Sequence, residues 1–420
     1  MKNSKSIQAV DKSTFERVFC KPLYDSYCFS RIPATILRLL TGKDIGGLPK
    51  DVDSGEIYDT VILFFLDGFG WRFFEKYADS YPFLQRFLKQ GIASKITSQF
   101  PSTTAPHVTC LNTNLPVGQS GVYEWFYYEP KVDAMIAPLM FSFAGDKKVG
   151  SLKNVPLAPE EIFPTRTFYQ QLKEEGITSY VMQDEHISHS AYSTVLGRGA
   201  NHVPFNTLEE GFAHLQALYE EANSKSYFCL YFGDVDGEGH HHGIDSEEFA
   251  AAVDHSLRAC EAFLSGLKPK NKTAFVMIAD HGMSVVDPKE TLYLNKKLPE
   301  VLPLLKKNRK GKILAPAGSC RDFFLHVEEE KLDEAKALIE KWVEGKAIVY
   351  KTSDLIAKGF FGSAPCSKLF LSRVGNLVIL PFEGNGVWWL EKGRFSQHFF
   401  GAHGGLSRSE METIFLFLDL

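Results

Sequence analysis

The sequence has no hydrophobic run long enough to cross a membrane. The longest apolar stretch near its start, Val61–Leu66, is far shorter than the roughly 20 residues of a transmembrane helix. The segment from Met1 to Asp11 also lacks the apolar core of a signal peptide. Basic residues form no long cluster, and the net charge of −5 gives no support for nucleic-acid binding. We therefore expect neither a membrane segment nor a nucleic-acid partner.

Cysteine is scarce and irregularly spaced. The seven cysteines are an odd number and include no Cys-x-x-Cys pair. Several fall within predicted strands or helices, where a reduced thiol packs as a small apolar group. We therefore predict a reducing, cytoplasmic location. The sequence also lacks internal repeats and low-complexity tracts.

What the sequence does contain is an alternation of strand-like and helix-like segments in 420 residues, enough for a large core and two folding units. The predicted strands are Val61–Leu66, Thr178–Met182, Tyr227–Phe232, Ala274–Ala279 and Ile414–Leu418. The predicted helices are Pro82–Gln90, Leu208–Ala222 and Glu247–Leu267. This alternation predicts a three-layer α/β domain, with a mostly parallel sheet and helices on both faces.

The rhythm changes at both ends of this pattern, which predicts three parts. Residues 1–55 form an N-terminal extension, and residues 56–284 with 399–420 form the α/β domain. Residues 285–398 form a smaller inserted α+β unit. The elements predicted in the insertion are strands Arg321–Val327, Lys346–Lys351 and Leu377–Pro381 and the charged helix Lys331–Val343. Its place between two acid and histidine clusters suits it to cap a site.

Acidic and histidine residues follow the ends of the predicted strands. The positions are Asp67, Asp234, Asp236, His240, His241, His242, Asp280, His281 and His403. Taken alone, an Asp-Gly after a strand is usually a turn, and three histidines in a glycine-rich loop could simply be solvated. In a parallel sheet, however, the carboxyl ends of the strands meet at one edge. Carboxylate and imidazole groups gathered there are the ligands that zinc takes, so the conjunction favours a metal site.

A hydroxyl-rich elbow, Phe100–His107, lies between the first two of these positions and contains Thr103 and Thr104. A helix is predicted to begin near Pro106. A hydroxyl just before a helix start feels the positive end of the helix dipole. Bound to a metal, such a hydroxyl can ionise near neutral pH and attack phosphorus. Either threonine offers that hydroxyl, the other one being expected to bond the backbone of the turn.

In this order, the clusters and the elbow resemble the alkaline phosphatase superfamily, specifically its type I phosphodiesterase/nucleotide pyrophosphatase branch. The resemblance covers most of residues 58–283 and 399–418. It implies an alkaline-phosphatase-like fold and a metal-dependent phosphoric ester hydrolase that acts on a small-molecule phosphoester. The family pattern places its nucleophile two residues before a proline, which selects Thr104.

The same resemblance implies two divalent metal ions, expected to be zinc. One would be held by Asp67, Thr104, Asp280 and His281, and the other by Asp236, His240 and His403. Asp234, His241 and His242 are then expected to have supporting or purely structural roles.

Two positions depart from the family pattern. Ala105 stands where nucleotide pyrophosphatases commonly place an aromatic residue that stacks on a base. Trp125 stands near the position of an asparagine that often holds a phosphoryl oxygen. The indole N–H of Trp125 or a backbone amide could take over that contact. The aromatic run Trp125–Tyr128 could line the pocket or belong to the core.

The charge around the elbow bears on the substrate. No Lys or Arg lies between Ile96 and Pro130, whereas a dianionic phosphomonoester usually needs one near phosphorus. The sequence therefore favours a phosphodiesterase. The alternatives are a phosphomonoesterase or phosphonate hydrolase with the same metals, and a catalytically silent metal-binding protein. A sulfatase is disfavoured because the elbow lacks a Cys/Ser-x-Pro-x-Arg nucleophile motif.

Overall fold

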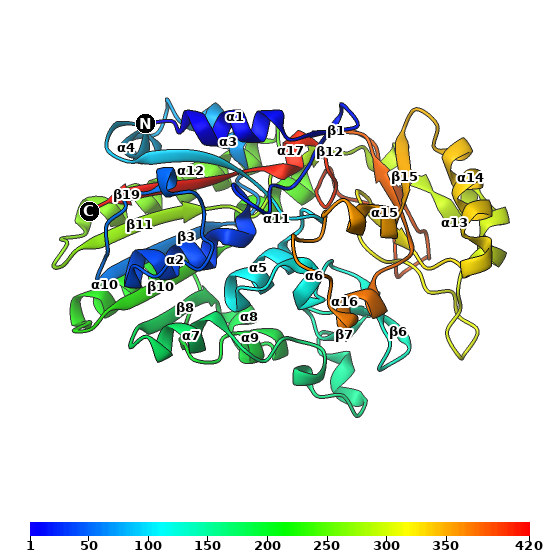
Figure 1. Ribbon diagram of the computed structural model, residues 1–420, viewed down its shortest axis with the longest axis horizontal. Coiled ribbons are helices and arrows are strands. Elements are labelled where there is room, and N and C mark those ends of the chain that lie inside the picture. The colour runs from blue at the N-terminus through cyan, green and yellow to red at the C-terminus, as the bar shows by residue number, and fades with distance from the viewer.

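The computed structural model describes residues 1–420 and is built around a seven-stranded sheet (Figure 1). In spatial order the strands are β4 (Ile92–Thr97), β19 (Glu412–Asp419), β11 (Thr273–Ile278), β3 (Thr60–Leu66), β10 (Ser226–Phe232), β8 (Thr178–Asp184) and β9 (Asn201–Phe205). β19 runs antiparallel to its two neighbours, and the remaining pairs are parallel. The predicted mostly parallel α/β fold is confirmed.

The central strand β3 explains why its sequence is an unbroken apolar run. Every residue of β3 is buried, because β10 and β11 flank it and helices cover both faces. Successive side chains point to opposite faces of a strand. Val61, Leu63 and Phe65 therefore join one hydrophobic core, and Ile62, Phe64 and Leu66 join the other.

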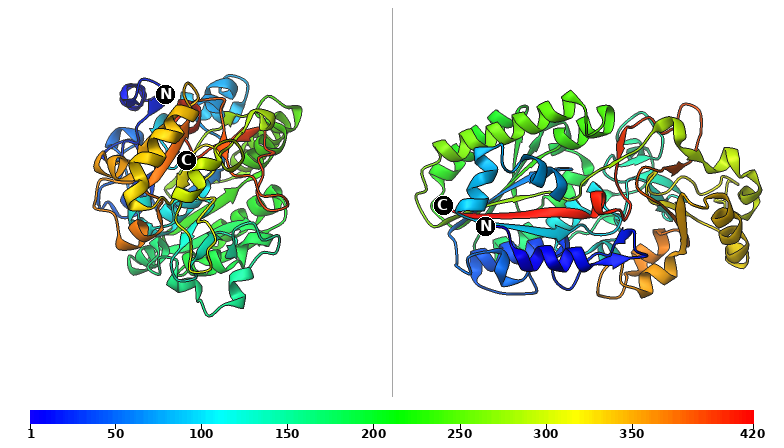
Figure 2. Two further views of the ribbon diagram at one scale, coloured as in Figure 1. Left: turned by 90° about the vertical axis from the view of Figure 1, so that its right-hand side faces the viewer. Right: turned by 90° about the horizontal axis from the view of Figure 1, so that it is seen from above.

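Helices form a layer on each side of the sheet (Figure 2). One layer contains α3 (Trp71–Tyr77), α4 (Pro82–Lys89), α10 (Leu208–Glu221) and α12 (Glu247–Gly266). The other contains α2 (Ile32–Thr41), α5 (Thr104–Thr113), α7 (Phe168–Glu174) and α9 (Ala191–Leu196). Between them they include the three helices predicted at Pro82–Gln90, Leu208–Ala222 and Glu247–Leu267 and the helix predicted near Pro106.

The first 55 residues pack against the sheet along much of their length. Helix α1 (Ser4–Lys12) lies beside β4, and Asn3 donates its backbone N–H to Ala93 at 2.8 Å. Val10 and nine successive residues of α2 are buried. A two-stranded ribbon of β1 (Thr14–Phe15) and β2 (Phe19–Cys20) joins the two helices. This part of the chain therefore contributes directly to the core under the sheet.

A third core of 23 buried residues lies in the inserted segment except for two members, Ala144 and Ala402. An antiparallel sheet of β14 (Phe323–Leu325), β16 (Leu377–Pro381) and β15 (Ala347–Lys351) packs on α14 (Leu332–Trp342). Figure 1 shows these elements at the end of the molecule away from both chain termini. The predicted division of the chain into three parts stays a prediction.

Shorter elements lie between these strands and helices and within the insertion. They are α6 (Val117–Ser120), β5 (Tyr127–Glu129), β6 (Ala134–Ala137), β7 (Ser142–Phe143), α8 (Glu185–Ser188), β12 (Ser284–Val285), β13 (Leu292–Tyr293), α13 (Leu294–Lys297), α15 (Thr352–Ala357), α16 (Lys368–Arg373), β17 (Val387–Trp388), β18 (Gly401–Ala402) and α17 (Arg408–Met411). All seven cysteines are free, and six are buried. No helix combines the length and apolar character that crossing a membrane requires. The cytoplasmic location stays a prediction.

Candidate active site

The hydroxyl elbow leads directly into helix α5, which begins at Thr104 rather than at Pro106. Pro106 is tolerated because N–H groups in the first turn of a helix have no acceptor within the helix, so no helical hydrogen bond is lost. Thr103 is the extended residue before the helix, and Thr104 lies in the first turn, where backbone N–H groups are free. The Oγ1 atom of Thr104 lies 3.5 and 3.4 Å from the two carboxylate oxygens of Asp67. It also lies 3.3 Å from Nε2 of His281.

The first cluster gathers at the ends of two neighbouring parallel strands. Asp67 follows β3 and Asp280 follows β11, and the register pairs Phe65 with Ile278. Nε2 of His281 lies 3.2 Å from Asp280 Oδ2 and 3.5 Å from Asp67 Oδ1. All three side chains are buried. Parallel register therefore brings these residues, over two hundred positions apart in the sequence, to one point.

The second cluster is carried by a helix, which corrects the prediction of a glycine-rich loop. Helix α11 (Asp234–His242) follows β10. Its 3.6-residue period places Asp236 and His240 on one face, with His240 Nε2 3.3 Å from Asp236 Oδ2. His403 comes from the loop after β18 and places its Nε2 3.5 Å from Asp236 Oδ1 and 3.0 Å from His240 Nε2.

The other three polar residues of α11 lie apart from this cluster. Asp234, His241 and His242 are exposed, since the helix turns them away from the face that carries Asp236. His242 instead lies 3.4 Å from Glu238 on the helix surface. His241 meets the ring of Phe399 edge to face, and Phe399 also packs against His240. The supporting or structural roles expected of these three residues stay predictions.

Backbone carbonyls orient all three histidines of the two clusters. Nδ1 of His240, His281 and His403 lies 2.8, 2.9 and 3.0 Å from the carbonyl oxygens of Gly401, Gly282 and Ser102, respectively. A carbonyl only accepts hydrogen bonds, so each Nδ1 carries the proton. In the neutral ring, each Nε2 then presents a lone pair to the cluster, as it does in histidines that ligate metals.

The residues of the site fit divalent cations. Oδ1 of Asp236 and Oδ2 of Asp280 are buried without a hydrogen-bond partner. Burial and the neighbouring charges of Asp280 and Asp236 raise the pKa of Asp67 well above its usual value. Buried carboxylates this close together need positive charge to remain ionised.

Two sets of three ligand atoms lie within 4.8 Å of one another: Asp67, Asp280 and His281, and Asp236, His281 and His403. His281 belongs to both sets. The structure thus brings all seven predicted site residues together, and the division of ligands between two ions stays a prediction.

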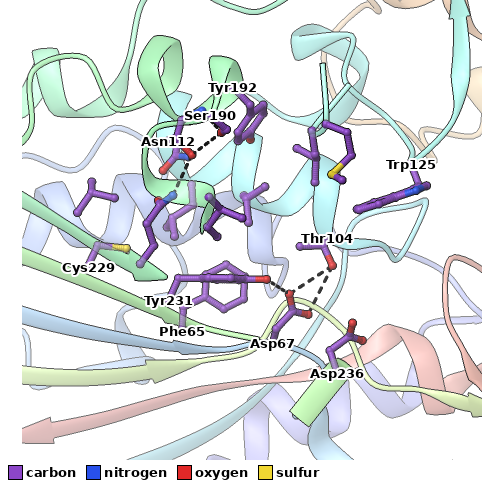
Figure 3. Close-up of a pocket in the computed structure, with 18 of the residues that line it drawn as sticks. Phe65, Asp67, Thr104, Asn112, Trp125, Ser190, Tyr192, Cys229, Tyr231 and Asp236 are labelled. Atoms are coloured by element: carbon purple, nitrogen blue, oxygen red, sulfur yellow. Dashed lines mark hydrogen bonds between the residues drawn. The ribbon is translucent and has the colours of Figure 1, made fainter. Parts of the chain in front are cut away.

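Two cavities meet at Thr104, and Figure 3 shows residues that line the first of them. The first, of about 290 Å³, has mostly apolar walls, including Phe65, Leu111 and Val181, and is polar at Asn112 and Gln183. The second, of about 430 Å³, lies under the insertion and has aromatic walls, including Phe126, Trp388, Phe395 and Phe399. Thr104, Trp125 and Asp236 line both cavities. Both volumes approach or reach the size of ligand-binding sites.

Comparison with known proteins decides the family. The family model described as type I phosphodiesterase/nucleotide pyrophosphatase matches residues 61–406. The chain belongs to this family. The predicted branch of the alkaline phosphatase superfamily is therefore confirmed, and the predicted enzyme class, a phosphoric ester hydrolase of the phosphodiesterase type, agrees with it.

Individual relatives agree with the family. Human ectonucleotide pyrophosphatase/phosphodiesterase family member 1 is 27% identical over 245 residues, which are 57% of this chain and 25% of that protein. Mouse family member 3 is 22% identical over 245 residues, 57% of this chain and 27% of its own length. The chain thus matches about a quarter of the length of these curated relatives.

Solved structures share the fold. Murine family member 5 aligns with a TM-score of 0.62 at 18% identity, covering 85% of this chain and 87% of that one. An inactive threonine-to-alanine variant of the same murine protein, in complex with AMP, aligns with a TM-score of 0.62 at 19% identity and the same coverage. At this identity the likeness concerns the fold.

In this member of the type I phosphodiesterase/nucleotide pyrophosphatase family, the aromatic run splits between site and core. Trp125 is 38% exposed and lines both cavities, whereas Tyr127 is buried and stacks on Tyr123. The backbone N–H of Trp125 donates to the buried carboxylate of Glu124. The backbone N–H of Trp125 is therefore engaged, whereas its indole N–H has no protein partner, and either this indole or another backbone amide stays a candidate to replace the family's asparagine.

The sequence did not reveal two residues that touch the candidate ligands. Tyr231, near the end of β10, donates its hydroxyl to Oδ2 of Asp67. Ser319, from the insertion, donates to the carbonyl oxygen of His403 at 3.0 Å. Because Tyr231 carries a polar group near the end of a central strand, the sequence could have indicated that it lies at the site. Nothing in the sequence around Ser319 indicates that it would meet His403, 84 positions later.

Proposed function

We propose that the protein is a phosphodiesterase with Thr104 as its nucleophile and two divalent metal ions, with zinc as the proposed metal. Asp67, Asp280 and His281 would hold one ion beside Thr104, and Asp236, His240 and His403 would hold the other. The observation that carries the proposal is the position of Thr104 Oγ1. It lies within 3.5 Å of Asp67 and His281, at the start of a helix and at the junction of two cavities.

Two further observations support the nucleophile and the metals. An inactive threonine-to-alanine variant is the form in which the murine relative was obtained with AMP, which accords with a threonine at the reacting centre. When bound, the metals would supply Lewis-acid stabilisation of the charge that develops on the phosphoryl oxygens and would acidify the attacking hydroxyl.

The residues of the chain define the course of the reaction. Thr104 Oγ1, freed of its proton, attacks phosphorus in line with the ester oxygen that leaves. The Oγ1–P bond forms as the P–O bond to the leaving group breaks, and the leaving oxygen takes up a proton. Water then attacks the same phosphorus and releases the phosphoryl group from Thr104. The positive end of the α5 dipole favours the negative charge on Oγ1 in both steps.

The two cavities support a diester as substrate. A diester carries an organic group on each side of phosphorus, and a separate cavity is available for each group. Neither Lys nor Arg lines the first cavity. The guanidinium of Arg394 in the second cavity already bonds Glu391 at 2.8 Å and the carbonyl of Ala144 at 2.7 Å. The first cavity therefore offers no positive side chain to a dianionic monoester, and the arginine of the second cavity is already engaged in other bonds.

A nucleotide ester is the proposed natural class. The polar end of the first cavity includes the side-chain amides of Asn112 and Gln183, which suit the hydrogen-bonding edge of a base. Its apolar walls suit the faces of that base. Because Ala105 offers no aromatic ring, recognition would depend on these walls and amides rather than on stacking against the residue after the nucleophile.

The test combines a substitution with a comparison of substrates. T104A should abolish hydrolysis of bis(4-nitrophenyl) phosphate while circular dichroism and bound metal stay as in the wild type. The wild type should hydrolyse this diester faster than 4-nitrophenyl phosphate. Activity retained by T104A would refute the nucleophile, and a preference for the monoester would refute the diester assignment. No hydrolysis of any phosphoester by metal-loaded protein would favour a silent metal-binding protein.

A further inference from the structure

His107 occupies a fully buried position in the first turns of helix α5, three residues after Thr104. It lines neither of the two cavities. Its ring meets the ring of Phe29 edge to face, with centroids 4.7 Å apart. Both ring nitrogens nevertheless bond the segments that build the site, so its part in the molecule goes beyond filling space.

Hydrogen bonds fix the tautomer of His107. The backbone N–H of Gln99 points at Nε2 across 2.8 Å, and a backbone N–H only donates. Nε2 must therefore accept, which places the proton of the neutral ring on Nδ1. Nδ1 lies 2.6 Å from the carbonyl oxygen of Thr103 and donates to it. Burial lowers the pKa of His107 to about 4, so the ring is neutral at physiological pH.

The acceptor of this bond belongs to the peptide unit that carries the nucleophile. The Thr103 carbonyl and the Thr104 N–H lie in one planar group. Holding the carbonyl oxygen therefore fixes the direction in which the backbone enters Thr104, and with it the starting point of the Thr104 side chain. That side chain must place Oγ1 3.3–3.5 Å from Asp67 and His281.

A second contact connects the same ring to the metal side of the site. Ser98 Oγ lies 2.8 Å from Nε2 of His107 and 2.7 Å from the carbonyl oxygen of Asp280, and its single proton is donated to one of them at a time. The end of β4, the elbow and the end of β11 therefore meet around one imidazole. The proposed nucleophile Thr104 and the candidate ligand Asp280 are thus both held by segments that pack around His107.

We propose that His107 is a positioning residue for Thr104, and that its Nδ1–H bond to the Thr103 carbonyl holds the nucleophile at its reacting position. This proposal rests on the proposed function, since it needs Thr104 to attack the substrate. His107 acts through the peptide before Thr104 and touches no reacting atom.

Two amide variants separate the two sides of the ring. In H107N, the side-chain NH2 can replace Nδ1–H and still donate to Thr103. In H107Q, the longer side chain reaches the Nε2 position and can accept from Gln99, with no donor at the Nδ1 position. Misplacement of a reacting group by about 1 Å costs on the order of 100-fold in rate. H107Q should therefore lose roughly 10- to 100-fold in kcat, whereas H107N should stay within a few-fold of the wild type.

The Michaelis constant and a control on the same helix complete the test. KM should change little in either variant, because His107 lines neither cavity. T113V removes a comparable contact, the bond from Thr113 Oγ1 to the carbonyl of Thr109 at 2.6 Å. It should lower the thermal midpoint and leave kcat unchanged.

Each outcome decides the matter. Equal kcat in H107N and H107Q, at similar thermal midpoints, would overturn the proposal. So would failure of both variants to fold, which would show that the ring serves the fold rather than Thr104. Failure of the proposed function has a different signature: an inactive wild type, or a T104A variant that keeps its activity.

Discussion

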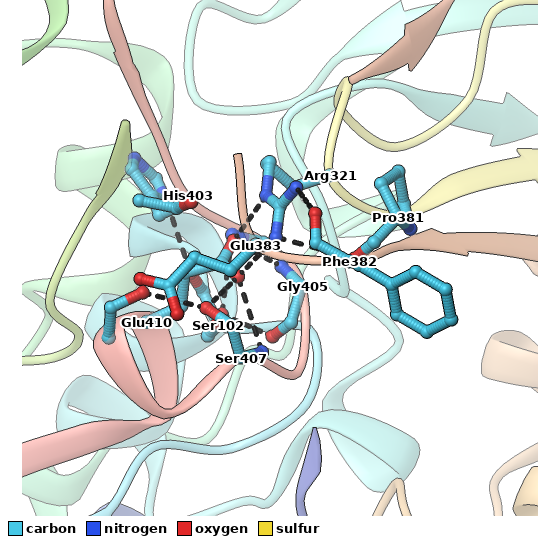
Figure 4. Close-up of polar contacts among 12 residues, drawn as sticks. Ser102, Arg321, Pro381, Phe382, Glu383, His403, Gly405, Ser407 and Glu410 are labelled. Carbon is cyan, nitrogen blue, oxygen red and sulfur yellow. Dashed lines mark hydrogen bonds and ion pairs between the residues drawn. The ribbon is translucent and has the colours of Figure 1, made fainter. Parts of the chain in front are cut away.

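The ion pair between Arg321 and Glu410 offers a test of how the insertion is fastened to the candidate site (Figure 4). Arg321 precedes β14 of the insertion, and Glu410 lies in α17 beyond His403. Both side chains are fully buried. Two contacts join them, Nε to Oε1 at 3.0 Å and Nη2 to Oε2 at 2.8 Å. Glu410 also accepts from the backbone of Gly405 at 3.0 Å.

The perturbation is E410Q, which keeps the shape of the side chain and removes its charge. Arg321 then remains as a buried cation without a counter-charge, which costs about 3–5 kcal/mol of unfolding free energy. R321M should cost more, because Arg321 also donates to the carbonyl oxygens of Phe382 at 2.9 Å, Pro381 at 3.4 Å and Asn385. Each buried carbonyl left without a donor adds about 1–3 kcal/mol.

Urea denaturation, with and without a chelator, measures these changes. Repeating the measurement with a chelator shows whether the loss of stability depends on bound metal. We expect no dependence, because neither Arg321 nor Glu410 is a candidate metal ligand. The matched control is E174Q, which breaks an ion pair between Arg166 and Glu174 whose side chains are 60% and 62% exposed. Solvent screens that pair, so E174Q should leave the stability near the wild type. A loss from E410Q no larger than that from E174Q would refute the reasoning.

Two further predictions concern the metals and the first cavity. Chelation should abolish turnover and lower the unfolding free energy, by about 2.7 kcal/mol per site if free metal stood at 100 times its dissociation constant. The reason is that Asp67, Asp236 and Asp280 lose their counter-charge; calorimetry with zinc re-addition checks this, and an unchanged midpoint would contradict it. N112L and Q183L should each raise KM for a 4-nitrophenyl nucleotide ester about fivefold, the equivalent of one hydrogen bond of about 1 kcal/mol. KM for bis(4-nitrophenyl) phosphate should not change, and an equal rise for both substrates would argue against base recognition by these amides.

Much of the sheet could be predicted because its strands are buried on both faces. Strands β3, β10, β11 and β19 each contain an unbroken apolar run of the length of a strand, which is typical of a strand buried on both faces. Strand β4 was missed because it contains Ser94 and Lys95. Both are nevertheless buried, and Lys95 lies 2.7 Å from Asp11 and 2.9 Å from Glu412. The charge of Lys95 is compensated by residues distant in the sequence, and these partners cannot be recognised from the local residue pattern.

The candidate site shows the same limit. Its seven residues could be named in advance because they match the pattern of the family that the sequence resembles, and the parallel register gathers the strand ends before Asp67, Asp236 and Asp280. Helix α11 could not be recognised, since its glycines oppose helix formation. A Cβ at Gly239 would stand 2.6 Å from the sulfur of Met283. Glycine at this position therefore allows close packing. Contacts with the rest of the fold, rather than helix propensity, then determine that this segment is helical. The contacts of Ser319 and His107 likewise depend on the assembled fold.

The meeting of two unlike cavities at one hydroxyl has a consequence for regiochemistry. An asymmetric diester can enter in two orientations, and each would leave a different half attached to Thr104. The first cavity is apolar with an amide-lined end, and the second is broad and aromatic. Their walls, rather than the reacting centre they share, would decide which of the two ester bonds is cut. Exchanging wall residues should therefore change which products form while the attacking group stays the same.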